Sequence, residues 1–202
     1  VLRDDGVVRT LWDAGGNDTL DMSLLFRPVD VTIDPGGVVG GWYVDNGDTS
    51  RTYIAYNVQI ENLVGGSAND RLVGNAGDNL LDGLGGVDTL DGGAGNDTYV
   101  IDASIGEIAV DPAGTDNVQS WVSVTLRADL ENLLLLGGGD TTGTGNSGIN
   151  RLEGNPGNNT LDGQGGDDTL FGYDGDDSLA GGGGADSLDG GTGNDSMAGG
   201  TG

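Results

Sequence analysis

A nine-residue repeat constrains this chain more than any other feature. The first block covers 65–100 and reads GGSANDRLV, GNAGDNLLD, GLGGVDTLD and GGAGNDTYV. The second covers 145–202 and reads GNSGINRLE, GNPGNNTLD, GQGGDDTLF, GYDGDDSLA, GGGGADSLD, GGTGNDSMA and an unfinished GGTG. A short, fixed period is typical of a solenoid, in which each repeat contacts only its neighbours.

Each repeat follows the pattern G-G-x-G-x-D-x-U-x, where U is apolar. Glycine at positions 1, 2 and 4 permits a tight turn whose carbonyl groups converge on one point, and Asp at position 6 adds a carboxylate there. Positions 7 to 9 form a short strand with one inward side chain. The predicted inward residues are Leu72, Leu81, Leu90, Tyr99, Leu152, Leu161, Leu170, Leu179, Leu188 and Met197.

If each repeat makes half a coil, repeats n and n+2 stack at the strand spacing of ~4.8 Å. This stacking brings Asp70 over Asp88 and Asp168 over Asp186. Two carboxylates ~5 Å apart repel by roughly 3 kcal/mol at an effective dielectric of about 20. A Ca²⁺ ion between the turns would reverse the sign, because it collects several carbonyl and carboxylate oxygens. The pattern therefore predicts strong calcium sites where Asp pairs with Asp.

Position 6 is Asn instead of Asp at Asn79, Asn150 and Asn159, so each block is expected to begin with weaker calcium sites. Sites that pair Asn79 with Asp97, or Asn159 with Asp177, are expected to bind calcium less strongly, as capping or partly occupied turns. We expect roughly five to eight calcium ions in all. The candidate ligands in the repeats are Gly65, Ser67, Asp70, Asn79, Gly83, Gly85, Asp88, Asp97, Asn150, Asn159, Gly163, Gly165, Asp168, Gly172, Asp174, Asp177, Gly181, Gly183, Asp186, Gly190, Thr192 and Asp195.

The composition excludes most catalytic chemistry. The chain has no Lys, His or Cys and carries a net charge of -26. Zinc sites with His or Cys ligands, His-based triads and thiol nucleophiles are therefore excluded, so no enzyme activity is expected within this chain. The charge also disfavours nucleic acid as a partner, and there is neither a long apolar run for membrane insertion nor a signal peptide.

The segments flanking the repeats read as strands, without an amphipathic helix. We expect an all-β, right-handed parallel β-roll with 1–64 as an N-terminal β-rich cap, 65–100 as the first block, 101–144 as a β-strand linker or cap, and 145–202 as the second block. Similar phrases, IENLVGGSAND at 60–70 and LENLLLLGGGD at 130–140, indicate a duplicated unit. Trp12, Trp42 and Trp121 are expected to pack in the caps, with a carbohydrate-binding platform as the alternative.

The repeat pattern resembles the calcium-binding nonapeptide of RTX proteins. In addition, TLWDAGGNDTLDMS at 10–23 and IAYNVQIENLVGGSANDRLVGN at 54–75 resemble the C-terminal domain of serralysin-type secreted metalloproteases. The resemblance implies a calcium β-roll that is joined to a zinc protease domain and exported by a type I secretion system. It also implies an early calcium turn with Gly16 and Asp18 as ligands.

The chain departs from that family in two respects. It has no H-E-x-x-H motif, so protease activity is not transferred to these residues. The C-terminal secretion signal is also missing, which is expected if the chain is truncated after Gly202.

Three functions remain open at this stage. The leading hypothesis is a secreted module that folds when extracellular calcium binds and that supports the export of a larger protein. The second is the C-terminal part of a serralysin-like protease, and the third is a self-assembling surface-layer or matrix module. A flexible acidic linker is disfavoured, because position 8 is apolar in every complete repeat.

Overall fold

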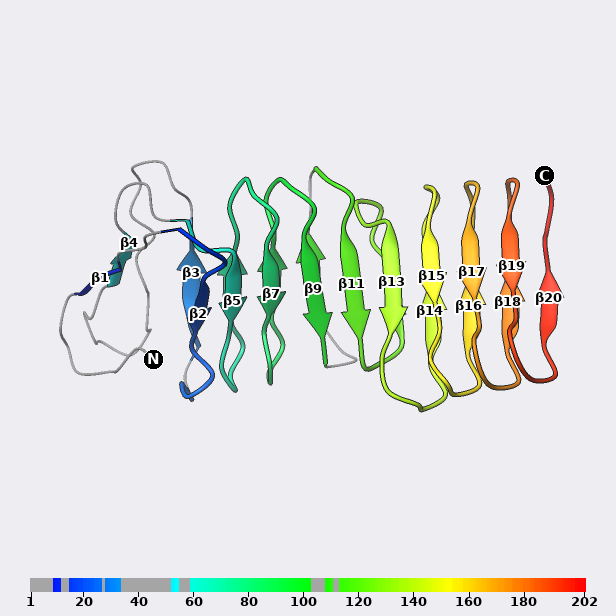
Figure 1. Ribbon diagram of the computed structural model, residues 1–202, viewed down its shortest axis with the longest axis horizontal. Coiled ribbons are helices and arrows are strands. Elements are labelled where there is room, and N and C mark those ends of the chain that lie inside the picture. The colour runs from blue at the N-terminus through cyan, green and yellow to red at the C-terminus, as the bar shows by residue number, and fades with distance from the viewer. Residues whose placement is uncertain are drawn as a thin grey trace. The chain divides into compact units, whose positions relative to one another are not determined.

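The structure, a computed structural model, describes residues 9–11, 15–26, 28–33, 52–54, 59–102, 108–110 and 113–202. These residues form short parallel strands joined by turns (Figure 1) and belong to two compact units, Val1–Gly114 and Thr115–Gly202. Among them there is no helix that could span a membrane. The arrangement confirms the predicted all-β parallel β-roll.

The described residues of the first unit form ten strands in parallel ladders. They are β1 (Arg9–Leu11), β2 (Thr19–Asp21), β3 (Asp30–Thr32), β4 (Thr52–Ile54), β5 (Asn62–Val64), β6 (Arg71–Val73), β7 (Leu80–Asp82), β8 (Thr89–Asp91), β9 (Thr98–Ile101) and β10 (Ile108–Val110). One ladder runs β2-β5-β7-β9, a second runs β3-β6-β8-β10, and β1 pairs with β4. Successive repeats alternate between the two longer ladders, as half coils should.

The second unit follows the same plan. Its strands are β11 (Asn117–Ser120), β12 (Val124–Thr125), β13 (Asn132–Leu135), β14 (Thr142–Thr144), β15 (Arg151–Glu153), β16 (Thr160–Asp162), β17 (Thr169–Phe171), β18 (Ser178–Ala180), β19 (Ser187–Asp189) and β20 (Ser196–Ala198). One ladder runs β11-β13-β15-β17-β19 and the other β12-β14-β16-β18-β20. The non-repetitive strands β11 to β14 thus continue the same ladders as the repeats.

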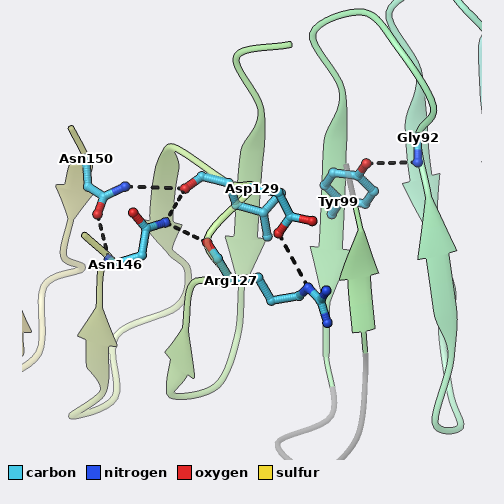
Figure 2. A network of polar contacts seen from close by, with 7 residues as sticks. Gly92, Tyr99, Arg127, Asp129, Asn146 and Asn150 are labelled. Atoms are coloured by element: carbon cyan, nitrogen blue, oxygen red, sulfur yellow. Dashed lines mark hydrogen bonds and ion pairs between the residues drawn. The ribbon is translucent and has the colours of Figure 1, made fainter. Parts of the chain in front are cut away.

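The core is a column of single side chains, one from the middle of each short strand. Position-8 residues Leu72, Leu81, Leu90, Tyr99, Leu152, Leu161, Leu170 and Leu179 are all buried. Each fully buried leucine stabilises the fold by about 1.5–3 kcal/mol. Tyr99 places a ring in this column, and its hydroxyl accepts a hydrogen bond from the Gly92 N–H at 2.8 Å (Figure 2), so the buried oxygen is satisfied.

Leu188 and Met197 continue the columns, in register with Leu170 and Leu179, but Met197 is 55% exposed and Leu188 only half-buried. Met197 pairs with Leu179 on one side and is the last member of its column in the printed sequence, so it is covered from one direction. Trp121 is 57% exposed beside Gly137 rather than packed in a cap, while Trp12 and Trp42 lie outside the described residues.

Candidate metal-binding turns

The turns stack over one another through the residue at position 6. In each stacked pair, the backbone N–H of one position-6 residue donates to Oδ1 of the Asp 18 residues later. The N···O distances are 2.7 Å for Asp70 to Asp88, 2.6 Å for Asn79 to Asp97, 2.8 Å for Asn150 to Asp168, 2.7 Å for Asn159 to Asp177, 2.9 Å for Asp168 to Asp186 and 3.0 Å for Asp177 to Asp195. The predicted stacking of the turns is therefore present in the structure.

The second carboxylate oxygen is left open at four of these residues. Oδ2 of Asp88, Asp168, Asp177 and Asp186 is buried and accepts no hydrogen bond. The first three side chains are buried almost completely, with exposures of 0%, 1% and 3%. A buried carboxylate oxygen without a partner costs free energy, because it has lost its water and gained nothing in return. A cation bound at this oxygen would remove that cost.

Burial in these turns makes the ionised carboxylates unfavourable, and no described arginine with an ion pair neutralises them. Burial is the main cause that raises the pKa of Asp88 to about 6; a hydrogen bond from the Asp70 N–H opposes the rise, and the carboxylate of Asp70 adds to it. Burial is also the main cause that raises the pKa values of Asp168 and Asp177. Three arginines form ion pairs with other, more exposed acids: Arg71 with Asp30, Arg127 with Asp129 and Arg151 with Glu153.

Glycine at position 1 makes room beside the open oxygen. A Cβ on Gly172 would lie 2.3 Å from Asp177 Oδ2 and 2.6 Å from the carbonyl oxygen of Gly190 in the next stacked turn. The two oxygens therefore face the Cα of Gly172 from two stacked turns. We call the space between the position-1 glycine, the open carboxylate oxygen and the carbonyl oxygen of the next turn the glycine cradle, and any side chain larger than glycine's would fill it. The equivalent distances at Gly163 are 2.3 Å to Asp168 Oδ2 and 2.7 Å to the Gly181 carbonyl oxygen.

The donor set fits calcium better than a transition metal. Nowhere in the described part of the chain do three or more acidic side chains converge. A cation in a cradle would therefore be held by carboxylates from Asp168 or Asp177 together with backbone carbonyl oxygens. Ca²⁺ accepts such mixed, all-oxygen shells in flexible geometry, whereas structural zinc sites use Cys or His.

The structure groups the predicted ligands along the stacked turns of each unit. In the first unit, Gly65, Ser67 and Asp70 stack with Gly83, Gly85 and Asp88, and Asn79 stacks with Asp97. The second unit has two stacks of three turns each. In one stack, the turn of Asn150 lies on the turn of Gly163, Gly165 and Asp168, which lies on the turn of Gly181, Gly183 and Asp186. In the other, the turn of Asn159 lies on the turn of Gly172, Asp174 and Asp177, which lies on the turn of Gly190, Thr192 and Asp195. Gly16 and Asp18 lie in the turn before β2, which the Asp18 N–H joins to Glu61, and the carbonyl oxygen of Glu61 accepts the Nδ2 of Asn79 in the next stacked turn.

Sequence reasoning missed a second ladder at position 5. There the side-chain oxygen accepts the backbone N–H of the residue 18 positions later, as Asn69 does for Val87 at 3.1 Å and Asp167 does for Ala185 at 2.8 Å. The position-6 bonds run in the opposite direction along the chain. The turns are thus held together both ways by protein groups alone. The frequent Asn or Asp at position 5 was the signal for this ladder.

Sequence reasoning also missed two glutamates that repeat the position-6 contact. The Asp18 N–H donates to Glu61 Oε2 at 2.8 Å, and the Asp116 N–H donates to Glu131 Oε2 at 2.9 Å. Asn62 N–H and Asn132 N–H in turn donate to the carbonyl oxygens of these two aspartates, at 3.0 Å each. The shared phrase E-N-L at 61–63 and 131–133 was the available signal.

Comparison with known families accounts for this geometry. Residues 3–137 match the family described as Peptidase M10 serralysin C terminal. The chain belongs to the serralysin C-terminal family. Residues 144–179 and 171–202 match the RTX calcium-binding nonapeptide repeat, so the stacked turns of the second unit are repeats of that type. The matched families are C-terminal and repeat modules, and neither is a catalytic protease domain.

Two curated proteins share part of the sequence. Serralysin from Proteus mirabilis is 40% identical over 67 residues, and metallopeptidase AprA from Pseudomonas marginalis is 38% identical over 72 residues. Each match covers 33% of this chain and 13% of the relative. The similarity is therefore to a small part of each relative.

Proposed function

We propose that this chain is a calcium-dependent folding module of a larger secreted protein. In this proposal Ca²⁺ binds in the glycine cradles, held by the open carboxylate oxygens of Asp88, Asp168, Asp177 and Asp186. The observation that carries the proposal is that these oxygens are buried without a hydrogen-bond partner, those of Asp168, Asp177 and Asp186 in turns that match the RTX repeat. The ion would supply the positive charge that joins one turn to the next.

The charge of the chain couples this binding to folding. A net charge of -26 opposes compaction of the metal-free chain, and the apolar core is one side chain wide. Calcium binding removes the repulsion and crosslinks stacked turns at the same time, so binding free energy becomes folding free energy. The module would stay unfolded at the low calcium of the cytosol and fold in the millimolar calcium outside the cell.

Circular dichroism of the full chain tests this proposal directly. We expect a disordered spectrum in excess chelator and a β-rich spectrum in millimolar Ca²⁺, with Mg²⁺ at the same concentration as the control. Magnesium demands compact octahedral geometry and keeps its water, so it should not substitute. A chain that is equally β-rich in chelator and in calcium would refute the proposal.

The wider role proposed here is support of type I secretion. Unfolded cytosolic chain can be threaded through an export machinery, and calcium would then prevent its return. The segments 1–64 and 101–144 would act as caps that cover the ends of the stacked repeats. Fusing the chain to a reporter and a C-terminal type I secretion signal, in a strain with the matching exporter, tests this role, and export that is unaffected by deleting 145–202 would contradict it.

A second candidate concerns the parent protein. The serralysin C-terminal match and the names of the two curated relatives favour a parent that is a zinc metalloprotease. The gene sequence upstream of Val1 tests this candidate. A helix with an H-E-x-x-H motif there would support it, and a lipase, epimerase or adhesin domain there would exclude it.

A further inference from the structure

Two kinds of turn in this chain differ at positions 2 and 6. The turn that begins at Gly65 belongs to neither kind, because its Asp70 carboxylate accepts the N–H groups of Val29 at 2.8 Å and Gly66 at 2.6 Å. Three turns have Asn at both positions and read G-N-x-G-x-N, beginning at Gly74, Gly145 and Gly154. The open turns described above have Asp at position 6 and another residue at position 2. Asn at position 6 therefore always comes with Asn at position 2, which indicates that the two amides act together.

In the G-N-x-G-x-N turns, the position-6 amide is fully engaged by the protein. Its oxygen accepts the backbone N–H of the position-2 Asn, at 2.7 Å in the pair Asn146 and Asn150. The Nδ2 of Asn150 donates to the carbonyl oxygens of Glu131 at 3.1 Å and Leu130 at 3.3 Å. The same bonds recur at Asn79, whose Oδ1 accepts the Asn75 N–H at 2.7 Å and whose Nδ2 donates to the Glu61 carbonyl at 3.1 Å.

The position-2 amide completes the closure. The Nδ2 of Asn146 donates to the carbonyl oxygens of Arg127 at 2.6 Å and Leu130 at 2.7 Å, and Figure 2 shows Asn146 and Asn150 side by side as they reach toward this segment. Asn155 and Asn159 close the third turn similarly, with Asn159 Nδ2 donating to Thr141 Oγ1 at 3.1 Å. These carbonyl and hydroxyl oxygens belong to the chain just before each run of repeats.

The open turns have a different backbone at position 2. Leu84, Gln164 and Tyr173 have positive φ angles of 58°, 72° and 77°. At Leu84 the N–H turns away from position 6 and donates to Asp82 Oδ1 at 3.0 Å, and at Gln164 it donates to Asp162 Oδ1 at 3.1 Å. The position-6 carboxylate of such a turn keeps one oxygen free for a cation.

We infer that the G-N-x-G-x-N turns bind no calcium, because the paired asparagine NH₂ groups link the turn to the preceding carbonyl oxygens as calcium links open turns. This inference rests on the proposed function for the open turns and specifies which turns it covers. An amide donates N–H groups and carries no net charge, so it satisfies the carbonyl oxygens without an ion. The turns at Gly145 and Gly154 are consecutive, so the repeats of the second unit begin with one metal-independent coil.

Calcium stoichiometry measured by titration calorimetry on the full chain tests the inference. The double variant N146G/N150D converts GNSGIN into the calcium-type GGSGID. We expect it to bind about one ion more than the wild-type chain. The matched control is N158D, which adds the same charge at an exposed position 5 where Asp makes the same bond in other repeats. It should bind the wild-type number of ions. Equal stoichiometry for N146G/N150D and wild type would overturn the inference.

The reverse variant keeps the test decisive if N146G/N150D fails to fold. Q164N/D168N converts an open turn into G-N-x-G-x-N, and we expect it to fold in calcium by circular dichroism while it binds about one ion fewer. Unchanged stoichiometry in a folded Q164N/D168N chain would overturn the inference. A wild-type chain that binds no calcium at all would instead refute the proposed function.

Discussion

Replacing Gly172 by alanine should block one calcium site from inside the cradle. The new Cβ would lie 2.3 Å from Asp177 Oδ2 and 2.6 Å from the Gly190 carbonyl oxygen, both far inside van der Waals contact. Gly172 does not have a positive φ, so the cost comes from crowding and lost binding rather than from backbone strain. Overpacking against a fixed backbone costs about 1–3 kcal/mol. Losing an ion present at about 100 times its Kd costs about 2.7 kcal/mol more.

Gly199 supplies the control for this variant. It occupies position 1 of its repeat as Gly172 does, but a Cβ there would meet no atom within 4 Å. In urea unfolding followed by circular dichroism, Gly172→Ala should lose about 4 to 6 kcal/mol in millimolar calcium and about 1–3 kcal/mol in chelator, if the metal-free chain folds at all. Gly199→Ala should lose less than about 0.5 kcal/mol. Equal calcium binding and equal unfolding midpoints for the two variants would refute the cradle.

Three further predictions follow from the core, the second ladder and the raised pKa values. Leu170→Ala should lower the free energy of unfolding in urea by about 2–5 kcal/mol, because it leaves a cavity in a buried column, whereas Met197→Ala should lower it by less than about 1 kcal/mol. Equal losses for the two variants would contradict the column. Asp167→Ala removes the acceptor for the Ala185 N–H, so it should cost about 0.5–1.5 kcal/mol with unchanged calcium stoichiometry, and a lost ion would show that position 5 is a ligand. Because the folded-state pKa of Asp88 is about 6, above its ordinary 3.8, its protonation stabilises the metal-free fold below 3.8 and this contribution is lost as pH rises through about 6. Circular dichroism in chelator should therefore show more β structure in acid. Calcium affinity should fall as the pH is lowered through the same window, because the protonated carboxyl group carries no charge. A flat pH profile would exclude this role of Asp88.

Much of the fold could be predicted from the repeat. A nine-residue period with one apolar residue per repeat requires short strands, and strands that face one column must stack in parallel. The stacking of Asp70 with Asp88 follows from the same period, because repeats n and n+2 are 18 residues apart. The exposure of Met197 and Trp121 could not be predicted, because burial depends on what lies over a side chain, which a local pattern does not contain.

The candidate site was predicted less completely. The pattern selects Asp and Asn at position 6 as oxygen donors, but it treats the asparagines as weaker versions of the same site. The structure separates them, since Asn150 reaches carbonyl oxygens of a segment outside the repeat. The partners of Glu61 and Glu131 could not be assigned from the shared E-N-L phrase alone, because Asp18 and Asp116 lie 43 and 15 residues away along the chain and outside any fixed period.

The sequence by itself determined the period, the single-file core and the oxygen-only chemistry of the turns, because each of these depends on residue type and spacing within one repeat. The tertiary structure alone decided which carboxylate oxygens remain open. Whether Oδ2 of a position-6 Asp finds a donor depends on the φ angle at position 2 and on the chain stacked beside it. These are relations between coils, because each oxygen of a turn is satisfied or left open by the chain that stacks beside it.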